Sequence, residues 1–175
     1  MINHFYFKKK QSLPKCLEVS LKIFKKNYNK INSEGKVSWQ YNSNKVLSIL
    51  SKDFEQAGFR IETNKKNKIS LKVKYKNQDK LKTFDVDGLN SKDKIILEVE
   101  AGRAYANNQF LKDVFEASVM EEVDYLILAV KNVYTFGKKK KTNSYDYNKI
   151  YQWLDILYSS KKITLDLKGI LLVGF

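Results

Sequence analysis

The spacing of apolar residues changes from helical to alternating and back along this chain, and that change limits the folds open to it. Two segments with apolar residues every three or four positions come first, and then Ile69, Leu71 and Val73 alternate with polar residues. The predicted elements, in chain order, are helices over about 14–28 and 44–57, strands over 69–75, 82–89 and 94–100, a helix over 108–121, a strand over 125–130, a helix over 147–158 and a strand over 169–175.

This order predicts an α/β fold with a mixed β-sheet flanked by helices. The short polar stretch 90–93 favours an antiparallel hairpin between its neighbouring strands, whereas the helix over 108–121 favours a crossover to the buried strand over 125–130. A chain of 175 residues is long enough for one core and short for two. We therefore expect a single domain over 1–175, with an N-terminal helical segment over about 1–35 and an αβββαβ core over about 44–175.

The sequence disfavours membrane-spanning, secreted, disulfide-bonded and zinc-binding proteins, because it lacks the features that each class requires. No stretch approaches the roughly 20 apolar residues that cross a membrane, and the lysines near the N-terminus follow apolar residues, the reverse of a secretory signal. We therefore expect a cytoplasmic protein without membrane contact. Cys16 is the only cysteine and His4 the only histidine, so neither an internal disulfide nor a structural zinc site is expected. Cys16 fits a small core residue better than a nucleophile.

The net charge of +14 indicates a polyanionic partner. Nearly all of this charge is lysine, because the only arginines are Arg60 and Arg103. Such a charge strengthens binding to phosphate backbones, but a solvated basic surface would have the same composition. Charge alone therefore leaves nucleic-acid binding and a merely basic surface as equal alternatives.

Acidic residues gather at one place in this basic chain. Asp85 and Asp87 are two residues apart in one predicted strand, and Glu98 and Glu100 are two apart in the next, so each pair is expected to share a face. Like charges on neighbouring strands destabilise a sheet unless a cation neutralises them, and Mg²⁺ prefers carboxylate oxygens. The alternative is a solvated edge hairpin whose acids pair with nearby lysines. The position of the glutamates directly before a helix favours a site.

The segment resembles the signature of the PD-(D/E)xK nuclease superfamily. Asp87-Gly88 lies eleven residues before Glu98 in the run Ile95-Ile96-Leu97-Glu98-Val99-Glu100, and the last residue matches the E-x-E variant found in BamHI-type restriction endonucleases. The order of predicted elements over about 44–175 also matches the restriction-endonuclease-like core. The chain departs from the signature in two ways: no proline precedes Asp87, and Glu100 replaces the usual lysine.

The resemblance implies a divalent-metal-dependent endonuclease. Asp87 and Glu98 would bind Mg²⁺, for which Mn²⁺ can substitute, and Glu100 would be a further ligand or the general base. Asp85 is the rival for the first position. The substrate would be the phosphodiester bonds of double-stranded DNA, as in a type II-like restriction endonuclease. Cutting both strands of a symmetric target would require a homodimer.

Other residues have weaker claims to the same site. Glu55, on the helix before the strands, could add another acid, although a solvated helix residue is the more ordinary interpretation. Arg103 could contact a phosphate or simply pair with a glutamate. The remaining candidates for DNA contacts are Asn107, Asn108, Lys138, Lys139, Lys140 and Lys141.

Two other functions fit the same pattern. One is a non-catalytic DNA-binding module of the same fold, which four unneutralised acids facing a phosphate backbone would disfavour. The other is an RNase or toxin nuclease, because the sequence does not separate DNA from RNA. The nuclease interpretation predicts that the strands over 82–89 and 95–100 are antiparallel neighbours and that Asp87, Glu98 and Glu100 converge on one cleft.

Overall fold

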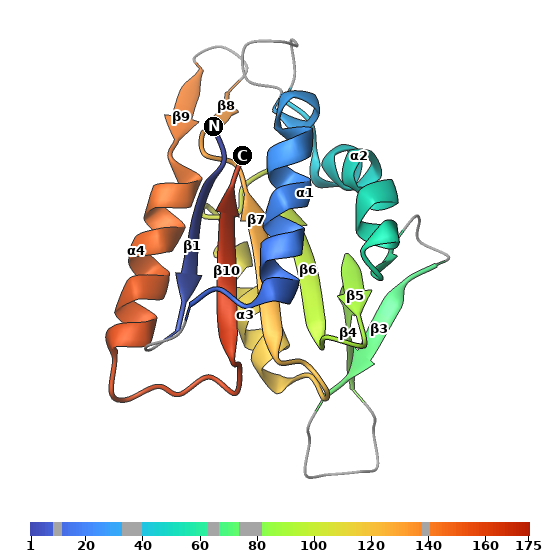
Figure 1. Cartoon of the computed structure of the whole chain (residues 1–175). Coiled ribbons are helices and arrows are strands. Elements are labelled where there is room, and N and C mark those ends of the chain that lie inside the picture. Colours follow the sequence, from blue (N-terminus) through green and yellow to red (C-terminus); the bar gives the residue numbers. More distant parts are fainter. Residues whose placement is uncertain (9–11, 33–39, 63–66, 74–81, 138–140) are drawn as a thin grey trace.

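A mixed six-stranded β-sheet, in the order β1-β10-β7-β6-β5-β2, forms the centre of the computed structural model (Figure 1). The structure describes residues 1–8, 12–32, 40–62, 67–73, 82–137 and 141–175. The strands are β1 (Asn3–Phe7), β2 (Arg60–Ile61), β3 (Ile69–Lys72), β4 (Thr83–Val86), β5 (Gly88–Asn90), β6 (Ile95–Glu100), β7 (Tyr125–Val130), β8 (Tyr134–Phe136), β9 (Thr142–Ser144) and β10 (Gly169–Gly174). The helices are α1 (Lys15–Ile31), α2 (Ser43–Gln56), α3 (Gln109–Val119) and α4 (Asp146–Ser159).

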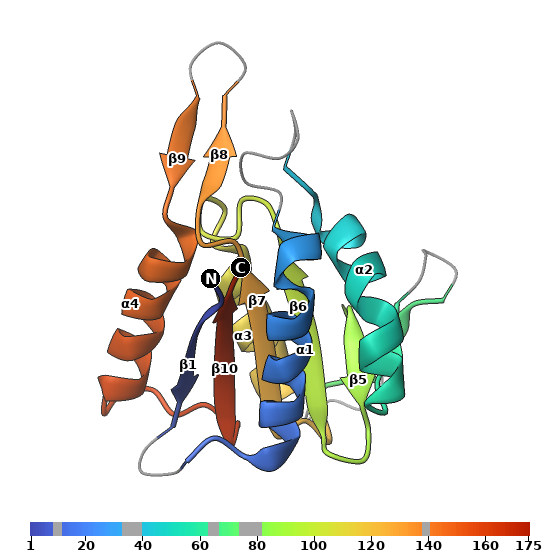
Figure 2. The ribbon, with the colours of Figure 1, turned by 45° about the horizontal axis from the view of Figure 1, so that its top comes forward.

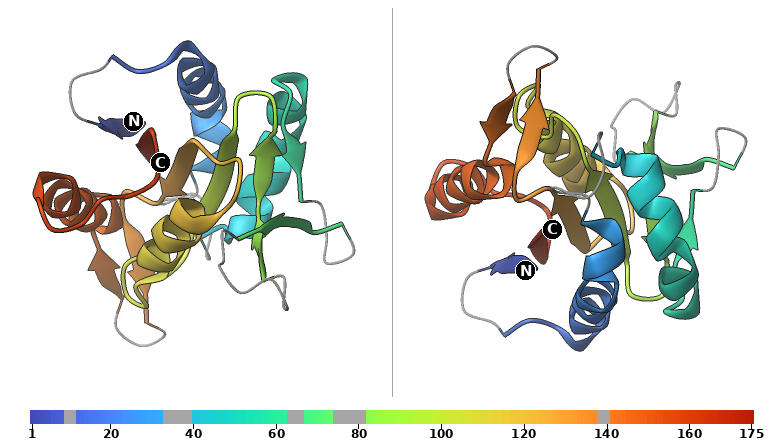
Figure 3. Two further views of the ribbon diagram at one scale, coloured as in Figure 1. Left: turned by 90° about the horizontal axis from the view of Figure 1, so that it is seen from below. Right: turned by 90° about the horizontal axis from the view of Figure 1, so that it is seen from above.

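Strands β6, β7 and β10 are parallel to one another, and most of their residues are apolar. Strands β1, β5 and β2 are antiparallel to their neighbours. Helices α1 and α2 cover one face of the sheet, and α3 and α4 cover the other (Figure 3). Two buried apolar clusters fill these two interfaces. Because alternate residues of a strand point to opposite faces, each central strand contributes to both clusters.

The α/β class, the mixed sheet and the flanking helices match the sequence-based expectation. The strand predicted over 125–130 has those bounds, and all four predicted helices are present within about three residues of their expected ends. Asn42, whose side chain accepts a hydrogen bond from the backbone N–H of Lys45, caps α2. Periodicity predicted these elements well because their buried faces are continuous.

Two expectations about the strands were wrong. Residues Asn3–Phe7 form β1 beside β10, so the N-terminal segment is not purely helical. The strand predicted over 82–89 breaks at Asp87: β4 pairs with β3 in a separate two-stranded sheet, and only β5 joins the main sheet. Strand β3, which lies within the strand predicted over 69–75, is therefore outside the main sheet, and β2 takes the place beside β5. The predicted turn at 77–80 lies outside the described residues.

Gly88 is the first residue of β5 and lies close to both neighbouring strands. A Cβ atom on Gly88 would lie 2.8 Å from Cδ1 of Ile61 and 3.2 Å from Cβ of Leu97. A larger residue would displace the end of the Ile61 side chain and crowd Leu97, so glycine suits the close packing of β5 between β2 and β6. The Asp87-Gly88 pair thus marks the entry of the chain into the main sheet, and the acidic side chain sits at that entry.

The second small sheet is a hairpin of β8 and β9 that projects beyond the carboxyl ends of β6, β7 and β10 (Figure 2). It connects β7 to α4. None of the helices in the described part of the chain is long and apolar enough to span a lipid bilayer.

Candidate active site

Strand β6 places Glu98 and Glu100 on the face covered by α3. Its alternate residues Ile95, Leu97 and Val99 pack in the cluster under α1 and α2, so the two glutamates point the other way. The side chain of Glu98 is buried, with 9% exposed, whereas Glu100 is half-buried at the end of the strand. The predicted alternation on this strand is therefore confirmed.

Asp87 lies beside these glutamates at the break between β4 and β5. Its Oδ2 accepts a hydrogen bond of 2.8 Å from the backbone N–H of Val99, and its carbonyl oxygen accepts one of 2.8 Å from the N–H of Glu62. The half-buried carboxylate is thus fixed to the strand that carries both glutamates. The backbone break leaves Asp87 next to β6 and carries the preceding residues away from it.

Asp113 on α3 joins the group, and the sequence analysis missed it. Only 3% of Asp113 is exposed, and its Oδ2 is buried without a hydrogen-bond partner. A signal was present in the sequence, because Asp113 stands between Phe110 and Val114 on the apolar stripe of the helix, where an acid is unfavourable. A charged residue on the buried face of a helix next to an acidic strand is a reason to include it in a candidate site.

The carboxyl groups of this acidic cluster, Asp87, Glu98, Glu100 and Asp113, all have raised pKa values. Burial is the largest cause at each. Repulsion from other members of the cluster adds to it at Glu98, Glu100 and Asp113, whereas at Asp87 the added repulsion comes from Glu62. The pKa rises to about 6 at Asp87, about 7 at Asp113 and about 8 at Glu100, and Glu98 lies well above its usual value. Lys112 opposes these shifts: its Nζ lies 3.8 Å from Asp113 Oδ1, and it also pairs with Glu116 at 3.0 Å. The acidic cluster therefore has less positive charge around it than its ionised form requires.

We expect the metal-free protein to lose stability as the pH rises from about 4.5 to about 8. A carboxyl whose folded pKa is raised binds its proton more tightly in the folded state, so its stabilising contribution is complete below the unfolded pKa and disappears as the pH passes the folded one. One pKa unit corresponds to about 1.4 kcal/mol. Thermal unfolding in EDTA across this range measures the loss.

The Glu100→Gln variant should flatten this pH profile, because the amide does not ionise. Glu55→Gln on α2 is the matched control and should leave the profile unchanged, since Glu55 is exposed away from the acidic cluster. A profile of Glu100→Gln as steep as that of the parent protein would contradict the electrostatic description of the cluster.

Asp85 and Glu55 do not join the acidic cluster. Asp85 pairs with Lys68 and accepts a 2.6 Å hydrogen bond from Ser70 Oγ within the β3–β4 sheet, and these contacts hold the pKa of its carboxyl below the usual value. It does not share a face with Asp87, because the strand expected to carry both is broken between them. Glu55 is exposed on α2, which packs on the opposite face of the main sheet.

Three of the candidate DNA-contacting residues follow the carboxyl end of β6 in the chain. Arg103, Asn107 and Asn108 are exposed in the loop between β6 and α3, and Arg103 is not among the ion pairs of the described residues. Arg103 has a φ of 58°, a left-handed conformation that is uncommon for a non-glycine residue. Lys141 is exposed at the outer end of β9, whereas Lys138, Lys139 and Lys140 lie outside the described residues.

The donor set fits a hard divalent cation in its chemistry, but it is not preassembled. All four members of the acidic cluster offer carboxylate oxygens, which Mg²⁺ prefers, and the buried Asp113 Oδ2 has no partner. However, the described part of the chain contains no three acidic, histidine or cysteine side chains placed to hold one metal ion together. A cation here would therefore be held by one or two carboxylates, with the remaining ligands coming from water or substrate.

A cavity of about 520 Å³ lies away from the acidic cluster, between the end of α4 and the loop before β10. It is lined by Leu157, Tyr158, Ser160, Lys161, Ile163, Thr164 and Leu165. Among these lining residues there is no carboxylate, and Lys161 is the one basic side chain. The lining therefore offers no group suited to metal-assisted hydrolysis. The acidic cluster remains the candidate site because its chemistry, and not its volume, sets it apart.

Comparison with known proteins identifies no relative: the sequence matches no family model and no curated protein, and the fold matches no solved structure.

Proposed function

We propose that this protein is a divalent-metal-dependent endonuclease that hydrolyses phosphodiester bonds of double-stranded DNA. The observation that carries the proposal is the acidic cluster, in which four carboxyl groups from β5's entry, β6 and α3 meet with raised pKa values in a chain of net charge +14. Placing buried acids together destabilises a fold, so a compensating function is the natural explanation.

The topology around the cluster supports the same proposal. Helix α2 is followed by the antiparallel strands β2, β5 and β6, then by α3 and by β7 parallel to β6. This αβββαβ order resembles the core of the PD-(D/E)xK nucleases, and it brings Asp87 beside Glu98 as the resemblance implies. Strand β1, the β3–β4 sheet and the β8–β9 hairpin are additions to that core.

Each acid has a separate role in this proposal. Asp87 and Glu98 would hold Mg²⁺ or Mn²⁺, and the bound ion would polarise the scissile phosphate and lower the pKa of a water. Glu100 lies at the exposed end of β6 and is the candidate to accept the proton of the attacking water, since a carboxyl titrating near neutral pH suits proton transfer. Asp113 would add the negative charge of a fourth carboxylate to the acidic cluster from α3.

A non-catalytic DNA-binding module is the second candidate. The absence of a preassembled three-residue metal site in the described residues favours it. Against it stands the repulsion that the acidic cluster would exert on a phosphate backbone without a cation. A metal held partly by substrate phosphate is common for Mg²⁺, so the first proposal remains the better one.

The test of this proposal is to separate DNA binding from cleavage. Binding to a labelled duplex should weaken steeply with salt and persist in EDTA, because lysines neutralise phosphates without a metal. Cleavage of plasmid and linear DNA should require Mg²⁺ or Mn²⁺ and stop in EDTA. Cleavage that continues in EDTA would reject the metal mechanism, and binding without cleavage under all metal conditions would favour the module.

The proposed partner chain is a second copy of the protein. One active site cuts one strand, so a restriction-type enzyme that cuts both strands of a symmetric DNA target would act as a dimer with two-fold symmetry. The proposed location of this enzyme is the cytoplasm. Sedimentation with and without a duplex measures the association. Double-strand cuts that depend linearly on the concentration of a monomer would argue against a dimer.

A further inference from the structure

Lys112 brings a positive charge to the acidic cluster. It lies in the first half of α3, and its Nζ is 3.8 Å from Asp113 Oδ1 and 3.0 Å from Glu116 Oε2. The pair with Glu116 joins residues four positions apart on one helix, so α3 itself keeps the ammonium group beside Asp113. The charge of Lys112 lowers the pKa of every carboxyl group in the acidic cluster.

This lysine neutralises the acidic cluster only in part. Its distance of 3.8 Å to Asp113 Oδ1 is too long for a hydrogen bond, and its closer partner, Glu116, is not a member of the cluster. Asp113 is 3% exposed, and its Oδ2 is buried without a hydrogen-bond partner. A single ammonium group cannot neutralise four carboxylates, so the acidic cluster still favours a further cation.

The ammonium group of Lys112 can leave this position more easily than the acids can. The side chain of Lys112 is 54% exposed, whereas those of Asp113 and Glu116 are 3% and 7% exposed. A half-exposed lysine has a flexible stem and can turn its ammonium group into water without opening the core. A divalent cation carries twice the charge and binds carboxylate oxygens directly. Such a cation would therefore repel the ammonium group and replace it.

We propose that Lys112 is a displaceable counter-ion of the acidic cluster, and that its positive charge weakens the binding of a divalent cation there. In the metal-free protein the ammonium group offsets part of the repulsion among the acids. Once a cation is bound, the ammonium group faces a like charge and turns towards Glu116 or water. This inference rests on the proposed function for the identity of the ligand, a divalent cation, but it depends neither on DNA nor on hydrolysis.

The experiment measures the affinity of the full-length protein for Mn²⁺ at neutral pH without DNA, from the paramagnetic resonance signal of the free ion. Lys112→Met removes the charge and keeps an unbranched side chain. It should bind Mn²⁺ about five-fold more tightly or better, because a unit charge at about 4 Å has this effect even at the dielectric constant of water. Lys112→Gln, which is also neutral, should do the same. Lys112→Arg keeps the charge and should bind Mn²⁺ within about two-fold of the parent protein.

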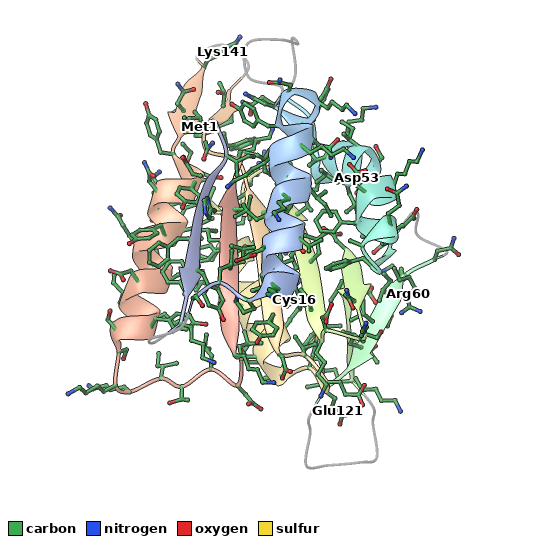
Figure 4. All side chains as sticks on the ribbon, viewed as in Figure 1. Met1, Cys16, Asp53, Arg60, Glu121 and Lys141 are labelled. Carbon is green, nitrogen blue, oxygen red and sulfur yellow. The ribbon has the colours of Figure 1, made fainter. Side chains whose placement is uncertain are left out.

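The matched control is Lys26→Met, which removes a lysine from an ion pair elsewhere. Lys26 Nζ lies 2.8 Å from Asp53 Oδ1, with the two side chains 65% and 17% exposed. Figure 4 shows Asp53 on α2, which packs on the face of the main sheet opposite α3. This variant loses the same charge from the whole molecule and none from the acidic cluster. Its affinity for Mn²⁺ should therefore stay within about two-fold of the parent protein.

Unfolding temperatures give a second measurement on the same variants. In EDTA, Lys112→Met should unfold at a lower temperature than Lys112→Arg, because the repulsion among the acids is no longer offset. Added Mn²⁺ should then raise the unfolding temperature of Lys112→Met by more than that of the parent protein, since a ligand that binds more tightly stabilises the folded state more.

The proposal is overturned if Lys112→Met and Lys112→Gln bind Mn²⁺ no more tightly than the parent protein. It is also overturned if Lys112→Arg or Lys26→Met gains as much affinity as the two neutral variants, because the local charge would then not be the cause. A parent protein that binds Mn²⁺ but cuts no DNA would contradict the proposed hydrolysis and leave this inference intact.

Discussion

Replacing Asp87 with asparagine or Glu98 with glutamine is expected to abolish DNA cleavage while the protein remains folded. Each change removes the charge of a proposed metal ligand at almost unchanged volume. Cleavage should fall by more than about 100-fold, since even indirect disturbance of a metal site has effects approaching this size. Folding should survive because Glu98 is buried with a raised pKa, so its neutral amide resembles the protonated acid.

Affinity gives this prediction its second measurement. Without metal, both variants should bind DNA as tightly as the parent protein or more tightly, because a charge near the phosphate backbone is removed. Glu100→Gln should also impair turnover severely if that residue accepts the proton of the water.

The matched control is Asp85→Asn, the same change two residues earlier. Asp85 is held by Lys68 and Ser70 in the β3–β4 sheet, so this variant should cleave DNA normally and lose less than about 1 kcal/mol of stability. If Asp85→Asn is inactive and Asp87→Asn is active, then Asp85, and not Asp87, is the residue that cleavage requires. If the parent and all variants bind DNA and none cuts DNA or RNA with Mg²⁺ or Mn²⁺, the binding module becomes the better interpretation.

Asp113→Asn is expected to change stability and activity in opposite directions. Above pH 7 the ionised carboxylate is buried with Oδ2 unpartnered, so the neutral amide should raise the metal-free unfolding temperature at pH 8. At pH 5 the acid is already protonated and the two proteins should unfold alike. Stabilisation by added Mn²⁺ and the rate of cleavage should both decrease, because the acidic cluster loses negative charge.

Glu116→Gln is the control for this second prediction. Glu116 is also buried on α3, but it accepts a 3.0 Å hydrogen bond from Lys112. Its amide should therefore not gain stability at pH 8. If Asp113→Asn is less stable than the parent at pH 8, or responds to Mn²⁺ and cuts DNA like the parent, then Asp113 is a structural residue outside the site.

The proposed roles of Glu98 and Glu100 could be predicted from the sequence because they depend on local order alone. A strand turns alternate residues to opposite faces, so Glu98 and Glu100 had to share one face once Leu97 and Val99 were buried on the other. Asp113 carried a similar signal, since its position on an apolar helical stripe is visible without a structure.

The sequence by itself determined the α/β class, the four helices and the central strands, because continuous apolar faces of helical or alternating spacing have one stable arrangement against a core. Only the tertiary structure separated Asp85 from Asp87 in space, because the strand predicted to carry both ends at Val86. Both belong to one alternating run in the sequence, but β4 pairs with β3 in a separate sheet, whereas β5 pairs with β2 and β6 in the main sheet. A contact between residues far apart in the chain leaves no mark in local spacing.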